Sequence, residues 1–361
     1  MKAEQRITNA LLAWYQKHHR TLPWRSDPSP YHVWISEIML QQTRVEAVKA
    51  YYERFLEELP DIASLANAPE DRLLKLWEGL GYYSRARNLK KAAQVIVSEF
   101  GGIMPDEAKV LKTLPGIGDY TAAAVASIAF GKREAVVDGN VLRVMARLRG
   151  DSRDILLSQT KKQVQTELYE NFLPKEAALC GTFNQALMEL GALVCVPNGA
   201  PHCEKCPVKK DCAAAKAGTQ ADYPVKSEKK RRRVEKRTVL LLSDHSRIAI
   251  RKRENKGLLA GLYEYPSLEG HITEAALRTL LRKQGIPALK LRPLPDAKHI
   301  FTHREWHMKG FLVETEEMEA ESFGEGLFFA DRRELETIYA IPSAFRVYTA
   351  CAKERLPVRK P

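Results

Sequence analysis

Two acidic residues stand where acid–base chemistry would need them. Glu37 lies inside the strongly apolar stretch from Trp34 to Thr43, which we expect to be helical. Because burial among apolar side chains raises the pKa of a carboxyl group, Glu37 is a candidate proton donor at neutral pH. A partly exposed helix glutamate paired with Arg44 or another base would fit the local sequence equally well.

The second acidic residue, Asp138, follows Ala135-Val136-Val137 and precedes a helix-forming segment that begins at Val141. An aspartate at such a position is expected to cap the helix. A carboxylate at a helix start also stays ionised and can face an electron-poor sugar, with Asn140 near enough to orient it. Glu37 and Asp138 would then supply an acid and an anion, as cleavage of an N-glycosidic bond requires.

The segment Leu114–Tyr120 predicts a tight turn between two helices, which we expect over Ala108–Leu114 and Tyr120–Phe130. Gly116 and Gly118 can adopt backbone angles that are closed to other residues. The N–H groups at the start of the second helix could hold a DNA backbone phosphate without reading any base. An ordinary loop between packed helices explains this glycine pattern, taken alone, about as well.

Four of the six cysteines fall in one short window, with gaps of seven, two and five residues: Cys195, Cys203, Cys206 and Cys212. This spacing predicts a metal site rather than a disulfide framework. A four-cysteine zinc site and a [4Fe–4S] cluster both need four thiolates, and the spacing alone does not separate them.

The hairpin, the aspartate and the cysteines occur in the order found in helix-hairpin-helix DNA glycosylases. More narrowly, the chain resembles the adenine DNA glycosylases of the MutY type over most of its length. The resemblance rests on Leu22-Pro23-Trp24-Arg25, Ser36-Glu37-Ile38-Met39-Leu40-Gln41-Gln42-Thr43-Arg44-Val45, Trp77-Glu78-Gly79-Leu80-Gly81-Tyr82-Tyr83-Ser84-Arg85, Phe183-Asn184-Gln185-Ala186 and Glu189-Leu190-Gly191-Ala192.

The resemblance implies three parts. Residues 1–213 would form a mainly α glycosylase domain with two helical lobes, the helix-hairpin-helix and a [4Fe–4S] module, 214–236 a basic linker, and 237–361 an α/β Nudix-like domain. It also favours [4Fe–4S] over zinc as the cofactor. The first cysteine gap in the family is usually six residues, whereas Val196–His202 makes seven. We expect the extra residue to bulge outward without loss of a ligand.

The implied reaction is removal of adenine mispaired with 8-oxoguanine, after the adenine nucleotide flips into a pocket. Glu37 would protonate adenine and Asp138 would stabilise the cationic sugar, with Tyr120 and Asn140 assisting. Related bifunctional glycosylases carry a lysine at the position of Tyr120, which forms a Schiff base that tyrosine cannot form. We therefore expect a monofunctional enzyme that leaves an abasic site.

The resemblance further assigns DNA contacts. Gln42 and Tyr82 would enter the duplex around 8-oxoguanine, with Leu80 beside them, because aromatic and amide side chains suit stacking and base-edge contacts. From the sequence alone, core packing explains Tyr82 equally well. Arg20 and Trp24 are expected to line the base pocket.

The C-terminal region resembles the Nudix-like domain of the same enzymes through Gly257–Pro266 and Phe301-Thr302-His303. We expect Thr302 and His303 to read the 8-oxoguanine strand, since the threonine hydroxyl keeps the hydrogen-bonding capacity of the serine common there. For His303, an ordinary surface or strand histidine is the alternative. The segment Glu274–Gly285 lacks the closely spaced glutamates of a Nudix hydrolase, so pyrophosphatase activity is not expected.

Composition favours a polyanionic partner, because 57 Lys and Arg oppose 45 Asp and Glu for a net charge of +12. Part of this charge lies in Lys226–Arg237, which we interpret first as a solvated linker. With no membrane-length apolar run and no N-terminal signal segment, we expect a soluble protein. It would be cytoplasmic, nucleoid-associated in a bacterium, and monomeric on double-stranded DNA. Beyond the linker we expect strands at Arg237–Leu242 and Arg247–Arg251.

Two alternatives remain. One is an endonuclease III-type or thymine-mismatch glycosylase, against which Tyr120, Glu37 and the Nudix-like region argue. The other is a catalytically silent damage-binding protein, which would keep the hairpin and the cluster but release no base. The sequence leaves open whether Asp138 forms a covalent intermediate or an ion pair, and whether the cluster has a redox role.

Overall fold

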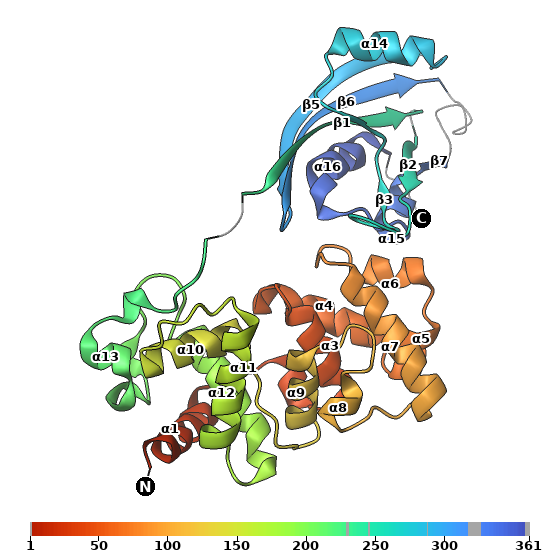
Figure 1. Cartoon of the computed structure of the whole chain (residues 1–361). Coiled ribbons are helices and arrows are strands. Elements are labelled where there is room, and N and C mark those ends of the chain that lie inside the picture. The colour runs from red at the N-terminus through yellow and green to blue at the C-terminus, as the bar shows by residue number, and fades with distance from the viewer. Residues whose placement is uncertain (1, 229–230, 245, 287, 317–325, 358–361) are drawn as a thin grey trace. The chain divides into compact units, whose positions relative to one another are not determined.

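The computed structural model describes residues 2–228, 231–244, 246–286, 288–316 and 326–357. Contacts within the chain divide it into two units (Figure 1). Unit 1 comprises Met1–Asn67 and Asn88–Glu228, and unit 2 comprises Lys229–Pro361 together with Ala68–Arg87. The second unit therefore includes a short segment from the first quarter of the sequence.

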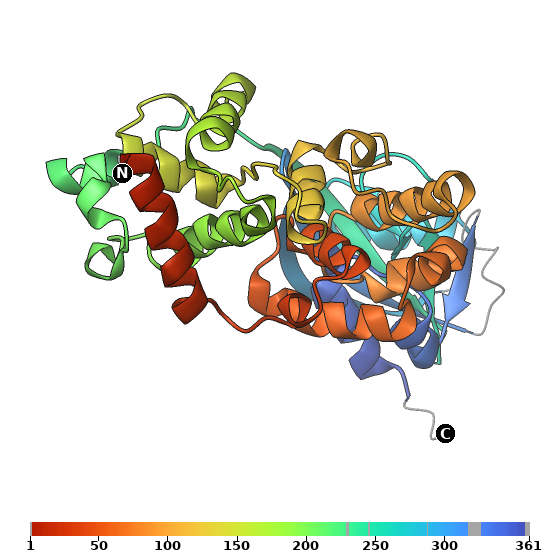
Figure 2. The same cartoon turned by 90° about the horizontal axis from the view of Figure 1, so that it is seen from below.

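Unit 1 is helical, and its described residues contain no strand. Figure 2 shows its helices from below, with α1 running from the N-terminus. The bounds are α1 (Ala3–His18), α2 (Pro23–Ser26), α3 (Pro30–Leu40), α4 (Val45–Glu58), α5 (Ile62–Asn67), α7 (Ser84–Phe100), α8 (Ala108–Leu111), α9 (Asp119–Ile128), α10 (Gly139–Arg149), α11 (Ser158–Glu167), η1 (Leu168–Phe172), η2 (Ala177–Leu179), α12 (Cys180–Leu193), η3 (Cys203–Lys205), η4 (Lys209–Asp211), α13 (Ala213–Ala217) and η5 (Gln220–Asp222). The first four residues of α7 are grouped with unit 2.

Helix α12 is central to unit 1, because it packs against α1, α9 and α10. Its apolar residues, including Phe183, Leu187 and Leu190, belong to a core that also takes in Leu11 of α1 and Val144 of α10. Burying such side chains is the main favourable term in folding. The packing places α9 and α10 beside α12, and α9 also contacts α3.

Unit 2 contains one sheet of seven strands and four α-helices among its described residues. The main strand order is β3-β2-β1-β6-β5, with β4 pairing β1 and β7 pairing β2. The bounds are α6 (Glu70–Leu76), β1 (Arg233–Ser243), β2 (Ile248–Lys252), β3 (Tyr263–Glu264), β4 (Ser267–Glu269), α14 (Glu274–Lys283), β5 (Ala288–Ile300), β6 (Arg304–Thr315), β7 (Leu327–Ala330), α15 (Arg332–Thr337), η7 (Ser343–Phe345) and α16 (Arg346–Arg355).

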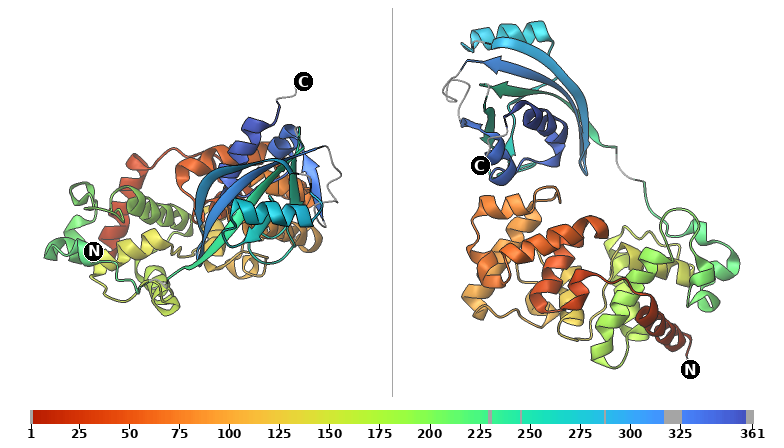
Figure 3. Two further views of the ribbon diagram at one scale, coloured as in Figure 1. Left: turned by 90° about the horizontal axis from the view of Figure 1, so that it is seen from above. Right: turned by 180° about the vertical axis from the view of Figure 1, so that it is seen from behind.

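Helices cover both faces of this sheet, with α14 on one side and α16 on the other (Figure 3). The side chains of β1 alternate accordingly. Val239 and Leu241 pack in the core that contains Tyr348 of α16, whereas Leu240 and Leu242 pack in the core that contains Leu277 of α14. A strand buried on both faces has a continuous apolar run. The predicted strands at 237–242 and 247–251 are thereby confirmed, with β1 beginning earlier.

Strands β5 and β6 pair antiparallel, and the turn between them is Phe301-Thr302-His303. Of the segment 214–236, predicted as a linker, part is helical in α13 and η5, and its last residues belong to β1. Lys229 and Lys230 of the basic run lie outside the described residues. No helix in the described part of the chain has the length and apolar character needed to cross a membrane.

Candidate active site

The site predicted in the helical region forms around a cavity of about 750 Å³ in unit 1. Helices α3, α9, α10 and α12 and the segment before α3 contribute side chains to it. Its lining includes Arg20, Trp24, Arg25, Glu37, Gln42, Tyr120, Asp138, Asn140, Lys161, Gln185, Met188 and Glu189. The structure thus brings together the four predicted catalytic residues, although they come from separate parts of the sequence.

Glu37 lies on α3 and is 6% exposed. The hydroxyl of Tyr120, from the first turn of α9, donates a hydrogen bond to Glu37 Oε2 at 2.5 Å. Burial raises the pKa of Glu37 to about 7, and the charge of Asp138 adds to this, while the Tyr120 hydrogen bond and Arg25 oppose it. A carboxyl group of this pKa can hold and release a proton near neutral pH.

Asp138 is the N-cap of α10, as predicted. Its Oδ1 accepts a hydrogen bond from the Val141 N–H at 2.7 Å, and its Oδ2 accepts one from Asn140 Nδ2 at 2.8 Å. Burial raises the pKa of Asp138, whereas these hydrogen bonds lower it by stabilising the charged form. Both oxygens are therefore oriented by donors on the same helix start.

A third acidic residue in the cavity, Glu189 on α12, has no role in the sequence prediction. Arg20 and Arg25 both reach its carboxylate, with N–O distances of 2.8 and 2.9 Å. Burial raises the pKa of Glu189, but these hydrogen bonds outweigh it and hold the value at about 2. The sequence does contain a signal for a buried acidic residue here, because Glu189 lies in an apolar helix as Glu37 does. Its arginine partners, however, lie about 165 residues away.

A chain of hydrogen bonds leads from Asp138 toward the cysteines. Asn140 accepts from Arg143 at 2.9 Å, and Arg143 also donates to the Cys195 carbonyl at 2.8 Å. Arg143 is buried. The position of the catalytic candidate Asn140 is therefore tied to the backbone of the cysteine segment.

The four cysteines of the predicted metal site line one small cavity. No three His, Cys, Asp or Glu side chains in the described ranges converge as ligands of a single metal ion. Arg147 donates to Cys195 Sγ at 3.3 Å and to the Val196 carbonyl at 3.0 Å. Four cysteine sulfurs around one cavity are the donor set that a group held by four thiolates needs. The segment 197–200 in the first gap is exposed, as a bulge would be.

The predicted hairpin corresponds to α8, a turn and α9, but two details were wrong. Helix α8 ends at Leu111 rather than Leu114. Only Gly116 uses a left-handed backbone, with φ of 77°, because Gly118 is an extended N-cap residue with φ of −92°. A Cβ at Gly116 would lie 2.6 Å from the Asn88 Cβ, whereas one at Gly118 would meet nothing within 4 Å. The close turn therefore depends on Gly116.

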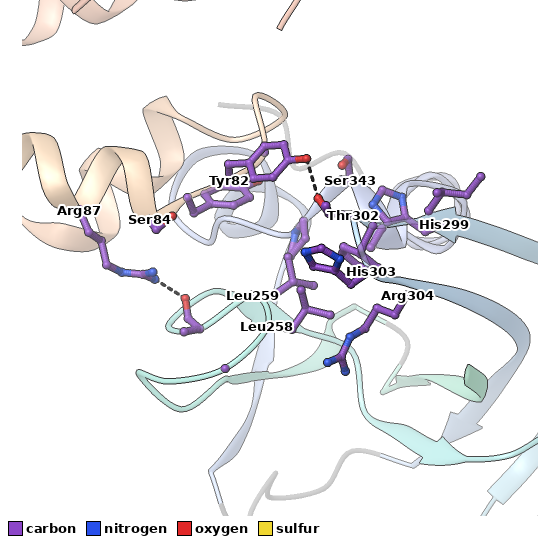
Figure 4. Close-up of a pocket in the computed structure, with 18 residues that line it drawn as sticks. Tyr82, Ser84, Arg87, Leu258, Leu259, His299, Thr302, His303, Arg304 and Ser343 are labelled. Carbon is purple, nitrogen blue, oxygen red and sulfur yellow. Dashed lines mark hydrogen bonds between the residues drawn. The ribbon is translucent and has the colours of Figure 1, made fainter. Parts of the chain in front are cut away.

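The residues predicted to read 8-oxoguanine lie in unit 2, around a second cavity of about 450 Å³ (Figure 4). The hydroxyls of Tyr82 and Thr302 are 2.9 Å apart, and His303 lines the same cavity. Tyr82 is 46% exposed and has φ of 48°. Gln42, in unit 1, also has a positive φ, of 58°. Leu80 is buried, so its predicted DNA contact would require the turn to rearrange.

Comparisons with known proteins agree with this architecture. The family profile described as "HhH-GPD superfamily base excision DNA repair protein" matches residues 35–174, and that of the NUDIX domain matches 237–350. A protein of Mus musculus named adenine DNA glycosylase is 37% identical over 354 residues, which cover 81% of this chain and 67% of that protein. One of Buchnera aphidicola subsp. Baizongia pistaciae is 34% identical, with coverage of 81% and 82%.

The chain belongs to the adenine DNA glycosylases. This membership confirms the predicted fold class and the predicted class of enzyme, a DNA glycosylase of base excision repair. The chain spans about two thirds of the length of the mouse adenine DNA glycosylase. The helical region also resembles the solved structure of a thermostable thymine-DNA glycosylase, with a TM-score of 0.53 and 30% identity over 60% of this chain and 97% of that one.

Proposed function

We propose that the protein binds double-stranded DNA carrying 8-oxoguanine opposite adenine and hydrolyses the N-glycosidic bond of that adenine. The observation that carries the proposal is the pairing of a buried acid, Glu37, with an oriented carboxylate, Asp138, in one cavity. In glycosidic cleavage, one carboxyl group must hold a proton and the other must be ionised, and the environment of each group decides which it does.

In this reaction Glu37 gives its proton to the adenine as the bond from base to sugar breaks. Asp138 faces the cationic sugar, and Asn140 keeps its carboxylate in place. Water then adds to the sugar carbon and gives its proton to the Glu37 carboxylate, leaving an abasic site and restoring the acid form of Glu37. Tyr120 holds Glu37 through the hydrogen bond to Oε2 and offers no amine for a Schiff base, so the enzyme is monofunctional.

The proposed DNA contacts come from residues that line the two cavities and from the hairpin. Arg20, Trp24 and Arg25 line the space for the flipped base, and the Glu189 carboxylate keeps both arginines fixed. Gln42 and Tyr82 enter the duplex beside 8-oxoguanine. Thr302 and His303 contact the strand that carries 8-oxoguanine, and the Gly116 turn binds a backbone phosphate. A helical domain over 1–213, a linker over 214–236 and a lesion-reading domain over 237–361 would divide this work.

Cys195, Cys203, Cys206 and Cys212 would hold a [4Fe–4S] cluster, which would brace the chain between α12 and α13. Arg147 and the Cys195 carbonyl contact then connect this brace to α10. Broad visible absorption that depends on these cysteines is expected, whereas a zinc site would be colourless.

The test is single-turnover base release from duplexes with adenine opposite 8-oxoguanine, guanine or thymine, and with thymine opposite guanine. Fast adenine release opposite 8-oxoguanine is expected, with a loss of about 10²- to 10⁴-fold in Glu37→Gln. Glu53→Gln, an exposed carboxyl on α4, is the control. Thymine release would favour a thymine-mismatch glycosylase, and binding without release would favour a silent damage-binding protein.

A further inference from the structure

A lysine and a glutamate in unit 2 form an ion pair in which the lysine side chain is largely buried and the glutamate side chain is 29% exposed. Lys75 lies on α6, and Glu78 follows that helix. Lys75 Nζ lies 2.6 Å from Glu78 Oε2, and the lysine side chain is only 9% exposed. Removing such charges from water is costly, so a buried pair persists only where further hydrogen bonds satisfy it.

Three further hydrogen bonds of the pair reach the main chain of residues 335–341. Lys75 Nζ donates to the Leu335 carbonyl at 2.9 Å and to the Tyr339 carbonyl at 3.1 Å. Glu78 Oε1 accepts from the Ile341 N–H at 2.7 Å. The ammonium thus uses all three of its donors. It also meets carbonyls at the C-terminal end of α15, where a cation is favoured.

The same glutamate begins the turn that carries Tyr82. Gly79 and Gly81 have φ of 102° and 70°, and Tyr82 holds a left-handed backbone although it has a side chain. Arg85 donates to the Leu80 and Gly81 carbonyls at 3.0 Å each. A strained residue of this kind persists only where its surroundings hold it. The turn is therefore stiff, and its placement follows the residues at its ends.

The turn that carries Tyr82 and the segment after Ile341 both line the cavity around Thr302. Ile341 is followed directly by Pro342, Ser343 and Ala344, which line that cavity together with Tyr82 and Thr302 (Figure 4). The Lys75–Glu78 pair consequently fixes the position of the turn that carries Tyr82 relative to Pro342–Ala344, which form one wall of the cavity.

We propose that Lys75 and Glu78 are positioning residues that align Tyr82 with Thr302, so that lesion discrimination depends on an ion pair whose partners are main-chain atoms. The inference rests on the proposed function, because the discrimination in question is between 8-oxoguanine and guanine opposite adenine.

The first test is Lys75→Met, measured by single-turnover adenine release opposite 8-oxoguanine and opposite guanine. The ratio of the two rate constants is expected to fall about tenfold, because a charge-assisted network is lost, while the rate opposite guanine changes little. The control is Lys252→Met. Lys252 also pairs with α6, through Asp71 at 2.6 Å, but its side chain is 42% exposed. The ratio should survive in this control.

Two further variants separate positioning from stability. Glu78→Gln keeps an oxygen for the Ile341 N–H but loses the charge, so a smaller loss in the same direction is expected. Lys75→Met combined with Thr302→Val should lose no more discrimination than the larger single effect, because both act through one contact. Poor folding lowers the active fraction equally for both duplexes and leaves the ratio of rate constants unchanged.

A native protein without preference for 8-oxoguanine would overturn the proposed function itself. A native preference that Lys75→Met and Glu78→Gln both retain would overturn the positioning role alone, as would fully additive effects with Thr302→Val. If Lys75→Met does not fold, Glu78→Gln alone decides the question.

Discussion

In the candidate catalytic cavity, Glu37 and Glu189 are 6% and 1% exposed, whereas Tyr82 in the second cavity is 46% exposed and Thr302 and His303 are also exposed. Glu37 and Glu189 are withdrawn from water, so the hydrogen bonds that each one makes strongly affect its pKa. The second region carries hydroxyl and imidazole groups, and its geometry depends on a turn in which Tyr82 has a positive φ. The proposed catalytic acid, Glu37, is therefore deeply buried, whereas the residues proposed to read the lesion are open to a large ligand.

The largest effect on the first cavity is expected from Asp138→Asn, which removes the charge of Asp138. Asparagine caps helices as well as aspartate does, so stability should change little. Loss of the charge facing the sugar should lower the rate of adenine release by about 10²- to 10³-fold. Single-turnover rates together with the thermal midpoint measure both effects. A normal rate in a folded variant would remove Asp138 from the mechanism.

The dependence on pH should separate the two regions. In the proposed mechanism Glu37 acts as its acid form, and burial raises its pKa to about 7, so above that pH the rate should fall about tenfold per pH unit. Because the folded protein keeps a proton that the unfolded chain has released, stability should also fall as pH rises from 4.5 to about 7. The ratio of rates opposite 8-oxoguanine and guanine should stay constant.

The recognition side is tested by Thr302→Val, which removes the hydroxyl that lies 2.9 Å from the Tyr82 hydroxyl. Discrimination between 8-oxoguanine and guanine should fall by roughly tenfold, the value of one lost hydrogen bond. The rate opposite guanine should persist, because the carboxyl groups of the first cavity are untouched. Thr302→Ser is the matched variant, and it should keep the discrimination. Unchanged discrimination in the valine variant would exclude the loop from lesion reading.

The smallest effect is expected at the hairpin, which lies outside both cavities. Gly116→Ala places a Cβ at φ of 77° and 2.6 Å from the Asn88 Cβ, so affinity should fall several-fold for every duplex alike. Gly118→Ala is the control, because its Cβ would meet open space. Titration of duplexes with and without the lesion gives both affinities. A lesion-dependent loss would contradict a purely backbone contact.

Some of this structure was predictable because its signals are local. The helix start after Asp138, the strand over 237–242 and the common cavity of the four cysteines follow from residue types at short spacing. The end of α8 and the role of Gly118 were missed. A run of good helix formers does not show where tertiary packing stops a helix.

What the sequence by itself determined is therefore the inventory: the acid, the anion, the capped helix, the glycine turn, the cysteine set and the order of the two domains. Tertiary structure decided how those groups behave. Burial among segments distant in the chain raises the pKa of Glu37, and the hydrogen bond from Tyr120, 83 residues away, lowers it. The charge of Glu189 depends on two arginines before α3, and the register of Tyr82 depends on contacts to residues 335–341. Desolvation and ion pairing act through space between segments that are distant in the chain, so no local pattern records them.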